Sequence, residues 1–534
     1  MTFLKNVCAS LTKNEFKTLA SFAIIFLVAS IALIATTISE NSTLIPVQGG
    51  IYREGIVGQP IAVNPVISGN PTDQDISALI YPKISDIIDT YTAEDNGRVF
   101  ILNLKEGLVW DDTKPLLSDD VVFTIQTAQE LGNQSPLSSV MQGIIAERMS
   151  ELQVRIALPV PYSFFDETLK KLPIIPKHIF GSIPAQNIRL SSYNLEPIGS
   201  GPYRFKTFSQ RKDGFITEYQ LIKNETYHGT QPFIQKFIFR FYENEENLLK
   251  AFRLREIDGF GSVGVIETRT IASQQTKITN IPMSRYYALF FNLGTSELLK
   301  NNSLRKALSL SVDKNQILST VFPNGPAEIV SGPLLGRESS LQNIGDAQVI
   351  LKKAKISGIN ISITVPKIDF LEKTAEEIKK QWMNLEEIEN VTIRTVEPKD
   401  MVEKVIKTNE YEALLFGNIL ENKKDLFPFW HSSQRMYPGL NLSFYKNQKL
   451  DLLIDTVRQT KDASKQQTLL KNAEEEILSD NPAIFLYTVP YTYIHTSELE
   501  GVIYEEDPNL SISNPRDRFL NVEKWYVTRA RILD

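Results

Sequence analysis

The chain of 534 residues has one cysteine, Cys8, and only four histidines. A single thiol excludes any disulfide within the chain, so the fold must be stabilised by its hydrophobic core, which a chain of this length can build. The histidines are scattered, and none has a second His or Cys at the spacing of a zinc site. We therefore expect no bound metal and no cofactor.

Motifs of common catalytic and nucleotide-binding sites are also missing. The sequence contains no G-x-x-x-x-G-K-[ST] phosphate loop, no G-x-S-x-G turn, no S-x-x-K and no H-E-x-x-H. Two acidic pairs, Asp111-Asp112 and Asp119-Asp120, are more typical of a turn and a helix cap than of a catalytic site. These absences favour a binding protein over an enzyme.

Charge of one sign is not concentrated anywhere in the sequence. The chain has 57 Lys and Arg residues against 63 Asp and Glu residues, a net charge of −6, and no basic block. A nucleic-acid partner is therefore not expected. The hydrophobic share of 42% and charged share of 22% are those of a globular protein. The length predicts three or four domain-sized units.

The one long apolar run is Leu19–Ile38, which carries no charge and is long enough to cross a bilayer as a helix of ~20 residues. Lys5, Lys13 and Lys17 precede it, whereas the first charge after it is Glu40, so the N-terminus should stay in the cytoplasm. We predict a single-pass membrane protein whose body is periplasmic or extracellular. Its parts are a cytoplasmic N-terminus (1–18), a transmembrane helix (19–38) and a spacer (39–45).

A cleaved signal peptide is the alternative interpretation of this run. Signal peptides have a shorter apolar core of ~7–15 residues and an A-x-A-like cleavage site. The best candidate here, Ala35-Thr36-Thr37, matches that pattern poorly. Cys8 precedes the run and therefore cannot be the lipid-modified first residue of a mature lipoprotein. An uncleaved anchor is the favoured reading.

Regular alternation of strand and helix patterns begins near residue 361. It predicts a β-α-β-α-β series, which implies a parallel or mixed sheet covered by helices. The elements are Ile361–Val365, Leu371–Leu385, Val391–Ile393, Pro398–Thr408 and Tyr411–Gly417. Ligands of such sheets lie beyond the carboxyl ends of the strands, so the loop after Gly417 is the first candidate site.

Other local patterns predict a strand over Val99–Leu104, a helix over Asp119–Leu131 with Ser118 as its N-cap, and a strand over Ala483–Ile494. Two helices should follow Asn301, the second of them capped by Asp313. In Pro197–Phe205, Gly199 and Gly201 suit a tight turn that directs Tyr203 and Phe205 into a core.

Five segments, in this order, resemble the extracellular solute-binding proteins of the dipeptide and oligopeptide ABC-importer type (family 5). They are Val99–Ile125, Pro197–Phe205, Phe290–Ile317, Asp425–Ser433 and Asn441–Asp462. The resemblance implies an α/β fold of the type II periplasmic-binding-protein class, with mixed sheets, two lobes and an extra domain. The expected division is lobe I (46–75, 190–285 and 491–534), an inserted domain II (76–189) and lobe III (286–490).

The resemblance also implies function. A peptide-binding member holds an extended peptide between its lobes, and a "G-W-x-x-D" loop supplies an Asp for the α-amino group of the peptide. The matching stretch here is Gly417–Glu421, in which Glu421 keeps the acid and Asn418 replaces the Trp. We predict a ligand site made by Glu421, Gly417, Asn418, Asp425 and Trp430.

The implied partners are a short peptide, an ABC permease and a separate ATPase subunit, and the chain is expected to be monomeric. Two other functions stay open: an anchored receptor for another solute or for signalling without transport, and an extracytoplasmic hydrolase with an unrecognised carboxylate pair.

Overall fold

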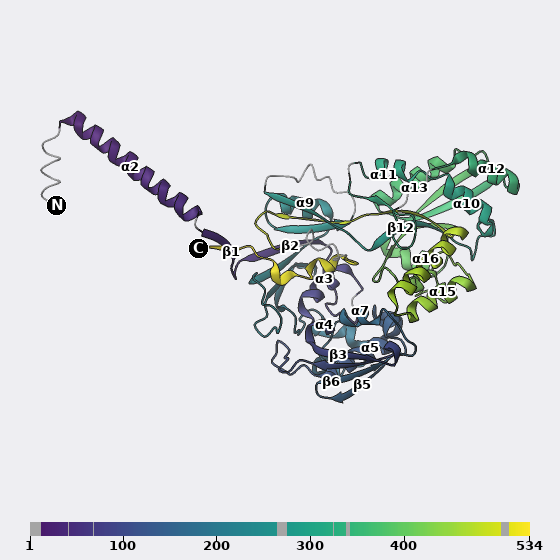
Figure 1. The fold of residues 1–534 in the computed structure, drawn as a ribbon, viewed down its shortest axis with the longest axis horizontal. Helices are drawn as coiled ribbons and strands as arrows, with labels where there is room; N and C mark the ends of the chain where they lie inside the picture. The colour runs from purple at the N-terminus through teal and green to yellow at the C-terminus, as the bar shows by residue number, and fades with distance from the viewer. Residues whose placement is uncertain are drawn as a thin grey trace.

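The computed structural model describes residues 12–40, 42–67, 69–263, 275–323, 325–337, 342–502 and 512–533. A long helix, α2 (Lys13–Glu40), projects from a body built on three larger sheets (Figure 1). The helix extends beyond the predicted span of 19–38 at both ends. Its apolar stretch, Lys13–Ile34, has a mean hydropathy of 2.2 and is not buried against the body, as expected for a helix that lies in lipid. Cys8 lies outside the described residues.

A two-stranded ribbon joins the helix to the body. Strand β1 (Ser42–Pro46) follows α2 almost directly and pairs antiparallel with β19 (Arg529–Leu533). The backbone N–H of Val47 continues the ribbon by donating to the carbonyl oxygen of Thr528 at 3.1 Å. The end of the chain therefore returns to the base of the helix, as Figure 1 shows.

The sheet nearest the ribbon has seven strands in the order β11-β18-β10-β2-β9-β8-β7. Strand β2 is parallel to both of its neighbours, and the other pairs are antiparallel. Helix α9 (Glu245–Arg253) follows β9. The strands are β2 (Ile51–Val57), β7 (Tyr203–Gln210), β8 (Ile216–Lys223), β9 (Lys236–Tyr242), β10 (Gly259–Val263), β11 (Thr276–Ile281) and β18 (Tyr491–Thr496).

A four-stranded antiparallel sheet in the order β3-β4-β6-β5 packs against helix α5 (Ser118–Leu131). The strands are β3 (Ile88–Glu94), β4 (Val99–Leu104), β5 (Ile145–Ser150) and β6 (Gln153–Ala157). The prediction of Ser118 as N-cap was wrong by one residue, since Leu117 holds that position. The carboxylate of Asp120 caps the helix by accepting from the N–H of Leu117 at 2.9 Å.

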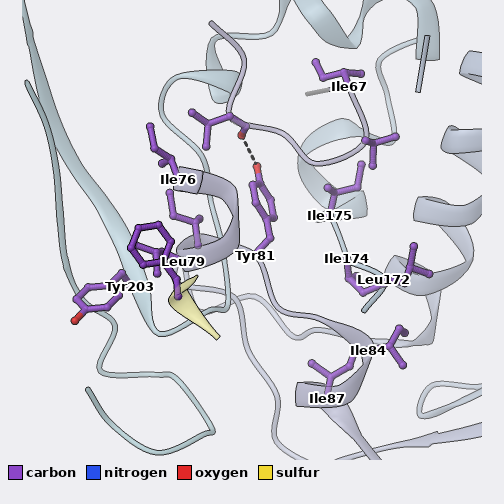
Figure 2. Packing of buried hydrophobic residues seen from close by; sticks show 14 of the residues in the cluster. Ile67, Ile76, Leu79, Tyr81, Ile84, Ile87, Leu172, Ile174, Ile175 and Tyr203 are labelled. Atoms are coloured by element: carbon purple, nitrogen blue, oxygen red, sulfur yellow. Dashed lines mark hydrogen bonds between the residues drawn. The ribbon is translucent and has the colours of Figure 1, made fainter. Parts of the chain in front are cut away.

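The core below the seven-stranded sheet gathers around helices α3 (Pro71–Ile80) and α4 (Ile84–Ile87) (Figure 2). Tyr203 is fully buried in it, which confirms that prediction. The glycines before Tyr203 allow their backbone to pack closely against Ile80. A Cβ at Gly199 would lie 2.1 Å from the carbonyl oxygen of Ile80, and a Cβ at Gly201 would lie 2.7 Å from it. The N–H of Gly201 donates to that same oxygen at 2.7 Å.

The third sheet has six strands in the order β13-β17-β12-β16-β14-β15. Strand β14 is parallel to β15 and β16, whereas β12 is antiparallel to its neighbours, so the predicted mixed sheet is confirmed. The strands are β12 (Arg285–Phe291), β13 (Glu328–Ile329), β14 (Ile359–Pro366), β15 (Ile388–Val396), β16 (Ala413–Ile419) and β17 (Ala483–Thr488).

Helices cover both faces of this sheet. Their bounds are α10 (Asn302–Leu310), α11 (Lys314–Val321), α12 (Ile344–Ala354), α13 (Asp369–Trp382), α15 (Gln448–Gln459) and α16 (Ala463–Asp480). The two helices after Asn301 and the Asp313 cap are confirmed, because the Asp313 carboxylate accepts from the N–H of Gln316 at 3.0 Å. The helix expected over Pro398–Thr408 is instead a 3₁₀ turn followed by a short π-helix, Val402–Ile406.

The predicted strand over Ala483–Ile494 is two strands in two different sheets. Strand β17 belongs to the six-stranded sheet and β18 to the seven-stranded sheet. Pro490 lies between them, and its missing N–H cannot continue a ladder. The chain also crosses between these sheets at 282–284, from β11 to β12. Two crossings, at 282–284 and 489–490, thus connect the two sheets, and we call this pair of crossings the hinge.

Candidate functional site

The loop that follows β16 is fastened to this hinge. The N–H of Leu420 donates to the carbonyl oxygen of Ser284 at 2.7 Å, and the hydroxyl of Ser513 donates to the carbonyl oxygen of Leu420 at 3.1 Å. The N–H of Ser284 in turn donates to Ile512 at 2.8 Å. The predicted site loop therefore starts where the first crossing and the C-terminal segment meet.

Glu421 is the next residue, and it is exposed. Within the described parts of the chain its carboxylate makes no hydrogen bond or ion pair, in contrast to Asp425 in the same loop. Of the nearby lysines, Lys423 is exposed as a whole, but its ammonium is partly shielded from water. This partial burial lowers the pKa of Lys423, and the charge of Arg337 lowers it further. Glu421 is thus an available acid beside the hinge.

Gly417 and Asn418 lie in β16 just before this loop and face β12. Gly417 pairs with Tyr287, and a Cβ at position 417 would lie 2.8 Å from the Tyr287 ring. The absence of a side chain at Gly417 therefore leaves room for that ring. Asn418 is only 3% exposed, and its Nδ2 donates to the hydroxyl of Tyr286 at 3.0 Å. The amide of Asn418 is thus engaged inside the protein.

Asp425 joins the loop to the segment that carries the four-stranded sheet. Its carboxylate accepts from the hydroxyl of Tyr162 at 2.7 Å and lies 3.5 Å from Nε of Arg458. The guanidinium of Arg458 lies between two rings, 4.3 Å from Tyr162 and 4.2 Å from Phe427. A second contact across the same boundary runs from Nδ2 of Asn422 to Glu167, at 2.9 Å.

Trp430 lies in helix α14 (Phe427–Trp430) and is 1% exposed. Its ring packs against Phe290 and Phe485, with centroids 6.2 and 5.7 Å away. Trp430 is therefore a core residue, and its packing holds the end of the loop against the six-stranded sheet. The ligand-binding roles of Glu421, Gly417, Asn418, Asp425 and Trp430 stay predictions.

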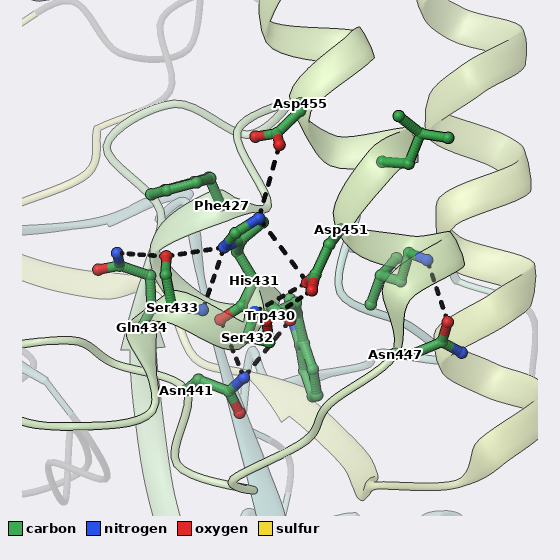
Figure 3. Close-up of polar contacts among 12 residues, drawn as sticks. Phe427, Trp430, His431, Ser432, Ser433, Gln434, Asn441, Asn447, Asp451 and Asp455 are labelled. Carbon is green, nitrogen blue, oxygen red and sulfur yellow. Dashed lines mark hydrogen bonds and ion pairs between the residues drawn. The ribbon is translucent and has the colours of Figure 1, made fainter.

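A polar cluster beside Trp430 ties α14 to α15 (Figure 3). Nδ1 of His431 lies 2.7 Å from the hydroxyl of Ser433 and also accepts from the Ser433 N–H at 3.1 Å. Asp451 accepts from the N–H and the hydroxyl of Ser432, at 2.8 and 2.5 Å. Ser, His and Asp side chains thus lie close together. However, the Ser433 hydroxyl and the His431 ring belong to residues two positions apart, and their contact stabilises a local turn.

The described residues contain no group of three His, Cys, Asp or Glu side chains that could hold a metal ion. Sequence reasoning did not single out four residues that lie in or next to the first crossing and the loop after β16: Ser284, Arg285, Ser513 and Tyr287. They lie at the start of a buried strand and in a C-terminal segment without a periodic pattern, so no local signal marked them.

Comparison with known proteins points to one family. The model described as "Bacterial extracellular solute-binding proteins, family 5 Middle" matches residues 84–435, which is more than half of the chain. Among curated proteins, the oligopeptide-binding protein AppA of Bacillus subtilis is 23% identical over 528 residues. The alignment covers 91% of this chain and 93% of that protein.

Solved structures share the fold. The ABC transporter substrate-binding protein CtaP of Listeria monocytogenes matches with a TM-score of 0.78 and 22% identity, over 90% of this chain and 99% of the other. AppA of B. subtilis, in complex with a nonapeptide, matches with a TM-score of 0.74 and 23% identity, over 91% and 100% of the two chains. The fold is therefore of the type II periplasmic-binding-protein class, preceded here by an apolar helix.

Proposed function

The chain belongs to the family of bacterial extracellular solute-binding proteins, family 5, and we propose that it captures short peptides between two lobes and delivers them to an ABC-type permease. The lobes are the predicted ones: lobe I (46–75, 190–285 and 491–534) and lobe III (286–490), with domain II (76–189) inserted. AppA, which this chain resembles, is an oligopeptide-binding protein. The ATPase would be a separate subunit, because this chain has no phosphate loop.

The observation that carries the proposal is the position of Glu421. Its carboxylate is exposed and unpaired within the described residues, on a loop that is hydrogen-bonded to the hinge. A peptide ammonium enclosed by lobe closure must be paired with an anion, because an isolated buried charge is unfavourable. Glu421 supplies that anion. The peptide backbone pairs with strand edges, so affinity comes from backbone hydrogen bonds and the protein has little specificity for the peptide side chains.

The other predicted residues shape and support this loop. Gly417 and Asn418 form its strand-side wall, while Asp425 and Trp430 hold it against domain II and the core of lobe III. The protein acts by binding and release, without catalysis. Hinge closure about the two crossings would enclose the ligand.

We propose that α2 is not cleaved and anchors the protein in the membrane. The helix is long and apolar enough to cross a bilayer, and the ribbon that follows it leaves little slack between membrane and body. The body would then stand on the outer side of the membrane as a monomer beside its permease. The intact mass of the protein from bacterial membranes separates an uncleaved anchor from a cleaved signal peptide.

Native mass spectrometry of the full chain in lipid nanodiscs tests the function. We expect a co-purified mixture of intact peptides at one per chain. Replacement of the carboxylate in Glu421→Gln should weaken peptide binding at least tenfold, while Glu376→Gln, an exposed acid on α13, should leave it unchanged. A single non-peptide ligand, or steady conversion of peptides to fragments, would overturn the proposal.

A further inference from the structure

Arg285 is a buried cation without a counter-ion among the residues that the structure describes. It is 7% exposed, and its Nη1 donates to the hydroxyl oxygen of Tyr287 at 3.3 Å. Its Nε is buried and makes no hydrogen bond. No carboxylate of the described residues lies within ion-pair distance of the guanidinium. A tyrosine hydroxyl alone does not neutralise the charge.

Two other buried arginines have hydrogen-bond or ion-pair partners on every guanidinium nitrogen. Arg518, 1% exposed, binds the carboxylates of Glu54 and Asp75 with distances of 2.8 to 3.1 Å. Arg305, 4% exposed, donates to four backbone carbonyls at the ends of neighbouring helices. Because a buried unpaired charge is strongly unfavourable, Arg285 is the exception that needs an explanation.

The position of Arg285 in the fold indicates which group could neutralise its charge. It is the first residue of β12, immediately after the crossing at 282–284, and it pairs with Ile419 at the end of β16. Tyr491, the first residue of β18 after the second crossing, lies nearby. Burial raises the pKa of Tyr491, and the charges of Arg518 and Arg285 oppose that rise. Tyr287, two residues further along β12, pairs with Tyr487 just before the second crossing. Arg285 therefore lies next to both crossings, where closure of the lobes would bring a ligand.

We propose that Arg285, with the Tyr287 hydroxyl, binds a carboxylate of the captured ligand at the hinge. This inference rests on the proposed function and adds the class of ligand: a molecule that presents an anion as well as an ammonium. The Tyr287 oxygen accepts from Arg285, so its own proton is available to donate to the same carboxylate. An arginine–carboxylate pair is strong and directional in such an enclosed place.

Gly417 belongs to this arrangement. The Tyr287 ring lies over the position of a Cβ at residue 417, so any larger residue would push the ring, and with it the hydroxyl, away from Arg285. This gives the glycine of the predicted site loop a second role: it lets Tyr287 reach the arginine.

The first test uses the full chain in nanodiscs and an equimolar mixture of synthetic peptides of two to nine residues. Each peptide is made as free acid and C-terminal amide, and with Glu or Gln at one internal position. We expect the parent to retain one acid form over its neutral partner at least tenfold. The pair that shows this preference identifies the source of the carboxylate, terminal or side-chain.

Arg285→Gln should abolish the preference, and Arg285→Lys should keep part of it. Glu421→Gln should instead weaken all peptides together, which separates the two sites. If Arg285→Gln keeps the tenfold preference, the inference is wrong although the proposed function stands. If the parent binds no peptide, the proposed function is wrong, and a second measurement decides the inference.

That second measurement requires no peptide. Millimolar succinate or citrate should raise the Tm of the parent by a few degrees relative to sodium chloride of equal ionic strength, but not that of Arg285→Gln. An equal rise in both proteins would overturn the carboxylate site. A lower Tm of Arg285→Gln with no change in the anion effect would show that Arg285 only stabilises the fold, which also overturns it.

Discussion

The carboxylate of Asp425 accepts a hydrogen bond from the hydroxyl of Tyr162 at 2.7 Å, between residues 263 positions apart in the chain. Burial raises the pKa of Tyr162, and the adjacent charge of Asp425 raises it further, so the tyrosine remains the donor. With Arg458 between the rings of Tyr162 and Phe427, this contact connects the site loop to the segment that carries the four-stranded sheet.

This contact predicts a measurable coupling. Tyr162→Phe and Asp425→Asn should each lower the free energy of unfolding by about 1.5 to 3 kcal/mol, the usual contribution of a hydrogen bond to a charged group. The double variant should lose less than the sum, because both changes remove one interaction. Urea unfolding measures all three. The exposed Tyr193→Phe should stay within about 0.5 kcal/mol of the parent, and strict additivity of the pair would contradict the coupling.

Local sequence patterns predicted the elements whose period is regular. Helix α13 buries Leu371, Ala375, Ile378 and Trp382 along one face, as the spacing indicates, and the strands around it follow the predicted alternation. The patterns could not show which strands pair. Pairing of β1 with β19 joins residues almost 490 positions apart, as in the contact of Ser42 with Arg531 at 3.3 Å.

Local patterns could indicate only part of the candidate site, for the same reason. The loop after β16 could be located because the carboxyl end of a strand is a local feature. The burial of Arg285 depends on two crossings far apart in sequence, and nothing in its neighbours distinguishes it from a surface arginine. The ligand-binding role of Asn418 stays a prediction, and nothing in the sequence indicated that its amide donates to the Tyr286 hydroxyl inside the sheet.

Among the ion pairs of the described residues, loss of a partner in the Arg518 cluster should destabilise the fold most. Arg518 joins β2, through Glu54, to α3, through Asp75, and all three side chains are buried. Arg518→Met leaves two buried carboxylates without a partner, so we expect a loss of about 3 to 5 kcal/mol in the free energy of unfolding. Chemical denaturation provides the measurement.

Arg211 is the matched control because it also pairs with two carboxylates, those of Asp213 and Glu243, but at the surface. Arg211→Met should leave the free energy of unfolding almost unchanged, because exposed ion pairs contribute little to stability. Equal losses in the two variants would show that burial does not determine the contribution of Arg518.

Close packing at Gly201 leads to a steric prediction. A methyl group there would lie within 2.8 Å of backbone atoms of Leu79 and Ile80, which cannot move as a side chain could. Gly201→Ala should therefore lower the free energy of unfolding by about 3 kcal/mol, the upper range for overpacking. Gly69→Ala is the control, since a Cβ at Gly69 meets nothing within 4 Å. A tolerated Gly201→Ala would show that α3 can shift.

Asp111 should make stability depend on pH in the direction opposite to most acids. Burial raises the pKa of Asp111 to about 6, although the N–H of Gly199 donates to its carboxylate at 3.1 Å. The native state thus holds this proton more tightly than the unfolded chain, whose Asp has a pKa of about 3.9. The stabilising contribution is complete below about pH 4 and is lost as the pH rises through about 6.

Asp111→Asn keeps an oxygen for Gly199 and removes the charge. At pH 7.5 we expect it to be more stable than the parent by about 1 kcal/mol, well below the full value of such a shift because the side chain is partly exposed. The advantage should disappear near pH 4, as thermal unfolding across this range can show. Glu376→Gln, at an exposed acid of α13 that makes no ion pair among the described residues, should follow the parent at every pH. A constant difference between Asp111→Asn and the parent across the range would mean that the carboxylate does not titrate between pH 4 and 6.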